Sequence, residues 1–139
     1  MVDFNFENVD ELALDFEAIS KWIETIVSRE TFELGELSYI FCDDVTILEI
    51  NQNFLNHDYY TDVITFDYTE RKLVSGDIYI SLDTVTSNAK LFKTPFLQEL
   101  HRVIIHGIFH LCGYKDKSEK DEKIMRQKED EALQLINLI

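Results

Sequence analysis

Hydrophobic and polar residues alternate at the start of the chain, and the period then lengthens to that of a helix. The alternation over Val2–Phe6 predicts a short, half-exposed strand. From about Asp15 to Glu30, apolar residues recur at the spacing of one helix face: Ile19, Trp22, Ile23, Ile26 and Val27. Gly35 ends this region, and the apolar run Leu37–Cys42 predicts a second, well-buried strand.

The middle of the chain predicts one more helix and two more strands. Asp43 and Asp44 are N-cap candidates, because a short acidic side chain can accept hydrogen bonds from the free N–H groups of the first turn. The strands are indicated by β-branched and aromatic residues. The expected elements are, in order, a helix over about Val45–Phe54, a loop at Asn56–Tyr60, a strand over Asp62–Tyr68, an exposed turn at Glu70–Ser75 and a strand over Gly76–Leu82.

From Asp83 onward the pattern is helical. Asp83 or Thr84 is expected to cap a helix running toward Phe92, and Pro95 permits a new helix start. A last helix opens near Ser118, and its inward face is expected to carry Met125, Ala132, Leu135, Ile136 and Ile139. The order of elements predicts one α+β domain over residues 1–139. It has a small mixed sheet of about four strands, about five covering helices, and a buried metal-ligand helix at its centre.

Charge and cysteine content narrow the function classes. The chain has 27 Asp and Glu against 13 Lys and Arg, a net charge of −14. Such a chain is not drawn to phosphate backbones, so a nucleic-acid role must rely on a local basic patch or a metal ion. Cys42 and Cys112 lie in apolar runs and match no CxxC pattern, which favours buried, reduced thiols, although a disulfide between them stays open. With no signal sequence and no membrane-length apolar run, we expect a soluble, cytoplasmic protein with no membrane partner.

The candidate chemistry lies in the segment HGIFHLCGYKD, residues 106–116. His106 and His110 are four residues apart, so on a helix they project from one face, as two ligands of one metal must. Gly113 can end that helix in a left-handed conformation, and Asp116 can then fold back as a third ligand. The alternative is a pair of buried histidines bonded to backbone carbonyls. As ligands, two imidazoles and a carboxylate with an open fourth position suit one zinc ion or another divalent metal.

Neighbouring residues refine this hypothesis. The spacing resembles that of zinc peptidases, but Gly107 stands where those enzymes carry a glutamate base, which weakens a peptidase interpretation. Gly107 is instead expected to clear space beside His106 for a bulky substrate. Glu99 is expected to share the histidine face and to orient a ligand. Arg102 is expected to pair with Glu99 or a substrate phosphate, or to form an ordinary surface ion pair, which is favoured. His101 is expected to be exposed and without a role.

Three stretches carry a resemblance to a known family: HGIFHLCGY (His106–Tyr114), TDVITF (Thr61–Phe66) and GDIYIS (Gly76–Ser81). Their sequence and order resemble the YbeY endoribonucleases, which act as rRNA maturation factors. The resemblance implies a zinc ion held by three histidines near a groove for RNA. His106 and His110 match two of these histidines, and the third falls on Asp116.

This chain departs from the family at two further positions. An arginine that matters for function in the family falls on Leu55, and a lysine falls on His57. Leucine cannot pair with a phosphate, whereas a protonated His57 can bind one; an exposed loop histidine with no role is the favoured alternative. Among the matched residues Thr61, Asp62, Gly76 and Asp77, architecture is the favoured role for all except Asp62.

The sequence therefore leads to one main functional hypothesis and two alternatives. The main one is a single-strand-specific, metal-dependent endoribonuclease that matures the 3′ end of the small-subunit ribosomal RNA. One alternative is a ribosome-assembly or quality-control factor that acts mainly by binding ribosomal proteins or a ribosome-associated GTPase, which a charge of −14 also suits. The other is a metal-dependent hydrolase of a different substrate. The sequence does not identify the catalytic base. Glu99 is the candidate for a carboxylate that lies behind the metal ligands and orients one of them.

Overall fold

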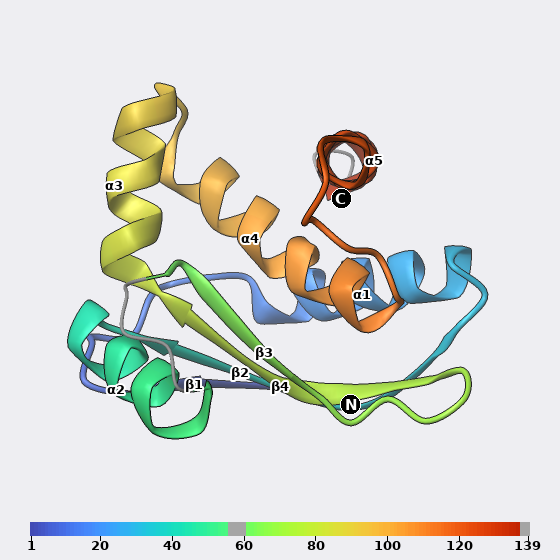
Figure 1. The fold of residues 1–139 in the computed structure, drawn as a ribbon, viewed down its shortest axis with the longest axis horizontal. Coiled ribbons are helices and arrows are strands. Elements are labelled where there is room, and N and C mark those ends of the chain that lie inside the picture. The colour runs from blue at the N-terminus through green and yellow to red at the C-terminus, as the bar shows by residue number, and fades with distance from the viewer. Residues whose placement is uncertain (56–60, 137–139) are drawn as a thin grey trace.

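The computed structural model describes residues 1–55 and 61–136, which form a four-stranded mixed sheet and five helices (Figure 1). In chain order the elements are β1 (Val2–Phe6), α1 (Phe16–Arg29), β2 (Glu33–Cys42), α2 (Asp44–Leu55), β3 (Val63–Asp67), β4 (Leu73–Ser81), α3 (Leu82–Phe92), α4 (Phe96–Leu111) and α5 (Glu119–Ile136). The strand order is β1-β2-β4-β3. The first three of these are mutually parallel, and β3 runs antiparallel to β4. The predicted α+β class is confirmed.

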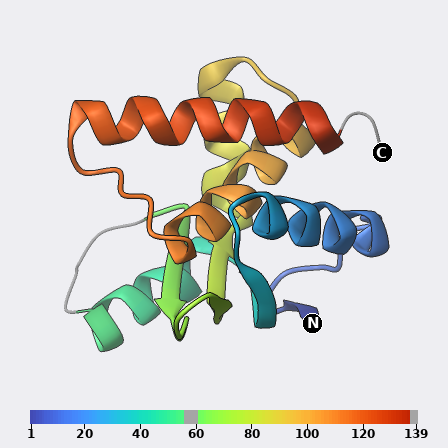
Figure 2. The ribbon, with the colours of Figure 1, turned by 90° about the vertical axis from the view of Figure 1, so that its right-hand side faces the viewer.

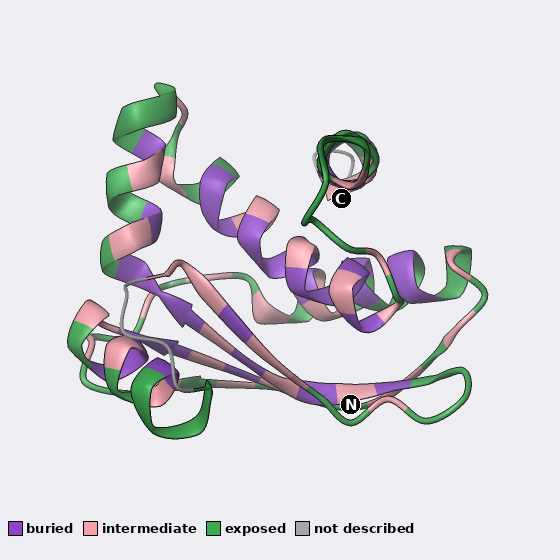
Figure 3. Cartoon of the chain, in the orientation of Figure 1, coloured by how far each residue is buried: buried purple, intermediate pink, exposed green. Residues whose placement is uncertain are grey.

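The helices lie unequally on the two faces of the sheet. Helices α1 and α4 cover one face, α5 packs outside them, and α2 lies against the opposite face (Figures 1 and 2). The main core fills the space between the sheet and α1 and α4, where the largest fully buried side chains include Trp22, Tyr39, Phe41 and Phe109 (Figure 3). Helix α4 is therefore enclosed between the sheet and α5, as expected of a central helix.

Specific contacts fix the position of α4. The buried Tyr39 hydroxyl donates a hydrogen bond to the carbonyl of Ile104 at 2.8 Å, which joins β2 to the middle of α4. A Cβ on Gly107 would lie 3.0 Å from Cδ1 of Ile78, so the glycine lets α4 approach β4 closely. Trp22 Nε1 donates to the carbonyl of Ala132 at 2.8 Å and joins α1 to α5. These two buried bonds fix α4 against the sheet and α1 against α5.

Two predicted strand starts are wrong. β2 begins at Glu33, and Gly35 lies inside it at a register shift instead of ending the helical region. A Cβ on Gly35 would lie 2.4 Å from Oγ of Ser75, so close approach to β4, and not a turn, requires glycine there. β4 likewise begins at Leu73, so half of the predicted exposed turn is paired strand.

The helix starts are predicted with mixed success. Asp43 accepts a hydrogen bond from the backbone N–H of Thr46 at 2.8 Å, so its capping role is confirmed. For α3, the Ser81 hydroxyl accepts from the N–H of Thr84 at 3.3 Å, so the prediction that Asp83 or Thr84 caps this helix is wrong. A strand-ending serine therefore starts the next helix directly.

The remaining expectations concern the chain's end, its thiols and its hydropathy. On α5, Met125 and Ala132 are buried as predicted and Leu135 and Ile136 are half-buried, while Ile139 lies outside the described residues. Cys42 is buried and Cys112 half-buried, and both are free thiols, so the open question of a disulfide is answered in the negative. None of the helices in the described ranges is long and apolar enough to cross a lipid bilayer.

Candidate metal centre

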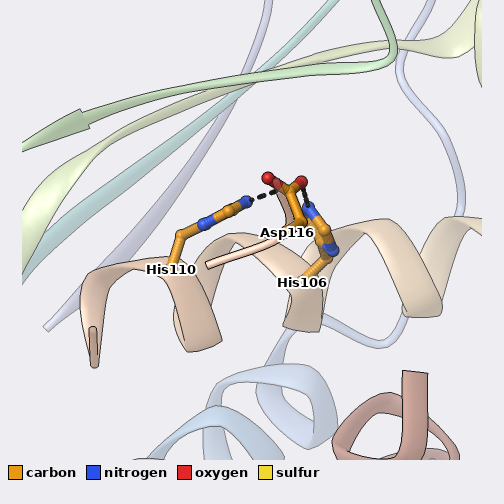
Figure 4. A group of neighbouring side chains, drawn as sticks. All are labelled: His106, His110 and Asp116. Carbon is orange, nitrogen blue, oxygen red and sulfur yellow. Dashed lines mark ion pairs between the residues drawn. The ribbon is translucent and has the colours of Figure 1, made fainter. Parts of the chain in front are cut away.

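Three potential ligand atoms converge beside α4. His106 and His110 lie one turn apart with their ring centroids 4.5 Å from each other, and the Asp116 carboxylate lies between the rings (Figure 4). Oδ2 of Asp116 is 3.4 Å from Nε2 of His106 and 3.3 Å from Nε2 of His110. Ligand atoms about 2.0–2.1 Å from a tetrahedral zinc ion are roughly 3.3–3.4 Å apart. The spacing of these donors therefore fits a single small divalent ion.

The turn after α4 brings Asp116 back to the histidines. Gly113 has φ +101, and the N–H groups of Gly113 and Tyr114 donate to the carbonyls of His110 and Phe109, both at 3.0 Å. This pair of bonds around a left-handed glycine is a Schellman motif. The Tyr114 ring then packs edge-on against Phe109 with centroids 5.6 Å apart, which completes the motif. The predicted glycine stop is confirmed.

Each histidine is oriented through its other ring nitrogen. Nδ1 of His106 lies 2.6 Å from Oε2 of Glu129, and Nδ1 of His110 lies 3.0 Å from the carbonyl of Tyr114. Nδ1 donates in both bonds when Nε2 carries the lone pair that a metal requires. Burial lowers the pKa of His106, but the hydrogen bond and the charge of Glu129 outweigh it and raise that pKa overall. Both rings are thus held with Nε2 toward Asp116.

Glu129 is itself fixed by an arginine. Nη1 of Arg102 donates to Oε1 of Glu129 at 2.9 Å, and Nη2 donates to Oδ1 of Asp130 at 2.7 Å. Glu129 is only 5% exposed, so the cost of burying its carboxylate must be offset by its two partners, His106 and Arg102. The network joins α4 to α5 across the metal-ligand face.

Two further carboxylates border the same space. A cavity of about 300 Å³ beside His106 and Asp116 is also lined by Asp62 and Glu99. Burial raises the pKa of Asp62, against the charge of His106. Burial also raises the pKa of Glu99, against the charges of Arg102 and Arg126. Either side chain can hold a proton at a pH where an ordinary carboxyl is ionised.

The structure brings together some of the residues singled out in the sequence and separates others. His106, His110 and Asp116 form one group, the arrangement that their spacing suggested. Glu99 lines the adjoining cavity, but within the described residues no hydrogen bond joins it to either histidine. His57 lies outside the described residues, and Leu55 is the last residue of α2 and is 38% exposed.

The ion pair favoured for Arg102 is present, but its partners are Glu129 and Asp130 and not Glu99, because α5 packs over that face of α4. Two other local expectations are wrong. The space beside Gly107 is filled by the side chains of Ile78 and Thr65, so it admits the sheet and not a substrate. His101 is half-buried, with its ring edge-on to Trp22 at a centroid distance of 5.8 Å.

The residue that sequence reasoning missed is Glu129. Its contact with His106 spans 23 residues of sequence, so no local pattern reports it. A signal was nevertheless present: Glu129 lies four residues after Met125 and three before Ala132, on the buried stripe of α5. A carboxylate on an apolar stripe needs a buried partner, and the helix that carries His106 and Arg102 offers two.

The fold and this site define a small α+β protein with a candidate metal site, at which two imidazoles and one carboxylate converge. A family model described as endoribonuclease YbeY matches residues 5–137. The chain is 51% identical over 138 residues to an endoribonuclease YbeY of Flavobacterium psychrophilum, covering 99% of this chain and 98% of that protein. It is 53% identical over 135 residues to an endoribonuclease YbeY of Porphyromonas gingivalis, covering 97% and 89%. A solution structure of a Thermotoga maritima protein superposes with a TM-score of 0.72 at 31% identity, covering 98% and 89%. The chain belongs to the endoribonuclease YbeY family.

Proposed function

We propose that this chain is a metal-dependent endoribonuclease that cleaves single-stranded RNA in the cytoplasm, with the 3′ end of the small-subunit ribosomal RNA as its substrate. One observation carries the proposal: in a chain of an endoribonuclease family, Oδ2 of Asp116 lies 3.4 Å from Nε2 of His106 and 3.3 Å from Nε2 of His110. A site built for one divalent ion beside an open cavity suits hydrolysis of a phosphodiester.

The donor set favours zinc. Two neutral imidazoles and one carboxylate are ordinary zinc ligands, and other divalent ions of similar size also accept them. The bound ion would stabilise charge on phosphoryl oxygens and make a coordinated water more acidic. The aspartate adds a negative charge where the family resemblance places a histidine, so we expect a less acidic metal centre than three imidazoles would give.

The protein's own groups account for orientation and proton transfer. Glu129 and the carbonyl of Tyr114 hold the two imidazoles in the tautomer that leaves Nε2 free. Asp62 and Glu99 border the cavity, and both have raised pKa values, so they are the candidates to accept and return a proton during cleavage.

The test is metal analysis and RNA cleavage on the same preparations. His106→Ala and Asp116→Ala should lose bound zinc and lose cleavage of a single-stranded RNA oligomer. His101→Ala, on the same helix but turned toward Trp22, should keep both. Undiminished cleavage by metal-free protein or by His106→Ala would refute metal dependence. Unchanged zinc content in Asp116→Ala would remove Asp116 from the ligands.

A second function is favoured by the charge of −14, which suits basic protein partners better than bare RNA. In that case the chain assists ribosome assembly by binding ribosomal proteins or a ribosome-associated GTPase. A pull-down separates the two functions, because binding partners would persist after both His106 and His110 are replaced. A peptidase role is disfavoured, since the position of Gly107 faces Ile78 and has no room for a glutamate base.

A further inference from the structure

The surroundings of the metal centre are strongly acidic. Two cavities, of about 300 Å³ and 290 Å³, meet at His106 and Asp116. Their linings include five carboxylates, from Asp62, Glu99, Asp116, Glu122 and Glu129. Two guanidinium groups, those of Arg102 and Arg126, are the cations on the same linings. A bound divalent ion would offset part of this negative charge at the metal centre itself, but an RNA phosphate elsewhere in these cavities meets repulsion unless one of the two arginines is available to it.

The two arginines are not equally available. Arg102 is 14% exposed and binds Glu129 at 2.9 Å and Asp130 at 2.7 Å, so both ends of its guanidinium fork are occupied. Arg126 lies on α5, is exposed and lines both cavities. Within residues 1–55 and 61–136 it forms no hydrogen bond or ion pair. Its fork is therefore free to bind an anion bidentately.

The opposite wall of the larger cavity carries an aromatic ring and an amide. Phe92 is the last residue of α3 and is 51% exposed although it lines the cavity. Asn88, one turn earlier, lines it too, and its side-chain amide forms no hydrogen bond within the described part of the chain. An exposed ring is a stacking surface for an unpaired base, and an amide offers a donor and an acceptor to a base edge.

We propose that Arg126, Phe92 and Asn88 form a nucleotide subsite beside the metal centre. Arg126 binds a phosphate of the RNA, Phe92 stacks on a neighbouring base, and Asn88 contacts the edge of that base. A cavity of about 300 Å³ is at the small end of ligand sites and matches one nucleotide unit. A paired base cannot reach the ring of Phe92, so the subsite selects single strands. The inference rests on the proposed ribonuclease function and deepens it.

The phosphate contact is tested by the salt dependence of cleavage. In the metal-loaded protein, kcat/KM for a single-stranded RNA oligomer is measured over a range of salt concentrations. Arg126→Gln should lower kcat/KM. It should also reduce the slope of log kcat/KM against log salt concentration by about 0.7, the contribution of one phosphate contact. Arg126→Lys should restore the slope. Lys123→Gln is the matched control, since Lys123 is an exposed cation on α5 outside both cavities.

The base contact is tested with abasic substrates. Phe92→Ala should lower kcat/KM by about 5- to 150-fold, the range for loss of one stacked base. An abasic site moved along the oligomer should cause a similar loss at one position in the wild type and none there in Phe92→Ala. Leu91→Ala is the control, because Leu91 is 72% exposed and does not line the cavity.

The outcomes separate the subsite from the function. If the wild type cleaves RNA but Arg126→Gln keeps the wild-type salt slope, the phosphate contact is wrong. If Phe92→Ala has the same kcat/KM as Leu91→Ala, and an abasic site lowers its activity at the same positions as in the wild type, the base contact is wrong. If the metal-loaded wild type cleaves no RNA, the proposed function itself fails.

Discussion

Glu129 is the residue whose replacement tests the metal centre most directly. Glu129→Gln keeps the size of a side chain that is 5% exposed, but it removes the charge that His106 and Arg102 share. Arg102 and His106 bind different oxygens of Glu129, so in glutamine the NH₂ group replaces one of these acceptors and faces a donor. The change therefore affects the orientation of His106 without touching a ligand atom.

The magnitude follows from the two bonds. A hydrogen bond to a charged group contributes roughly 1.5–3 kcal/mol, and a neutral one about half as much. Weakening the bond of 2.6 Å to His106 and that of 2.9 Å to Arg102 by about half should lower the free energy of unfolding of metal-free protein by about 1.5–3 kcal/mol. Loss of the carboxylate behind a metal-bound histidine costs about 10- to 100-fold in metal affinity.

Two measurements check these values. Zinc affinity is measured by competition with a chelator, and unfolding is followed in urea with the chelator in excess. Asp130→Asn is the matched control, because Asp130 binds the other nitrogen of Arg102 and its side chain is 55% exposed. It should cost at most about 1 kcal/mol and leave zinc affinity unchanged. Equal zinc affinities for Glu129→Gln and the wild type would refute the role assigned to Glu129.

Three further predictions follow from other contacts. Gly107→Ala should lower the free energy of unfolding by about 1–3 kcal/mol in urea, because its Cβ would lie 3.0 Å from Cδ1 of Ile78; an unchanged midpoint would contradict this tight approach. Tyr114→Phe should lower the free energy of unfolding by about 1.5–3 kcal/mol, because the 2.6 Å hydrogen bond from the Tyr114 hydroxyl to Glu30 is lost. A urea midpoint equal to that of the wild type would contradict this value. Zinc at about a hundred times its Kd should add about 2.7 kcal/mol to wild-type protein and nothing to His106→Ala, as measured by thermal unfolding.

Local pattern was sufficient for most of the fold. The strand β1 and the helix α1 fall within one residue of their predicted bounds, because alternation and helical period there match which side chains are buried. Gly35 was misjudged, since the constraint on it comes from Ser75 on a neighbouring strand. Ser81 was missed as a cap because it also ends a strand. Both errors arise where a distant or adjoining element sets the residue's role.

The site was predictable only along α4. The spacing of His106 and His110, the turn at Gly113 and the return of Asp116 all lie within one short segment, so the sequence places them together. The partners from α5 were not accessible to the same reasoning. Arg102 and Glu129 are 27 residues apart, and the packing angle of α5 on α4 decides that they meet. The sequence thus predicted that the three candidate ligands lie together, but it did not reveal Glu129 and Arg102, which fix the orientation of His106.

The bond from Glu129 to His106 also couples the last helix to the state of the site. When α5 separates from α4, His106 loses its carboxylate, so the opened form must bind a metal more weakly than the closed form. By thermodynamic linkage the metal then holds α5 in place to the same extent, although α5 supplies none of the ligand atoms. Backbone amides of α5 should exchange with solvent more slowly in the zinc-loaded protein. Protection of α5 from exchange would therefore report metal binding at a site to which this helix contributes no ligand.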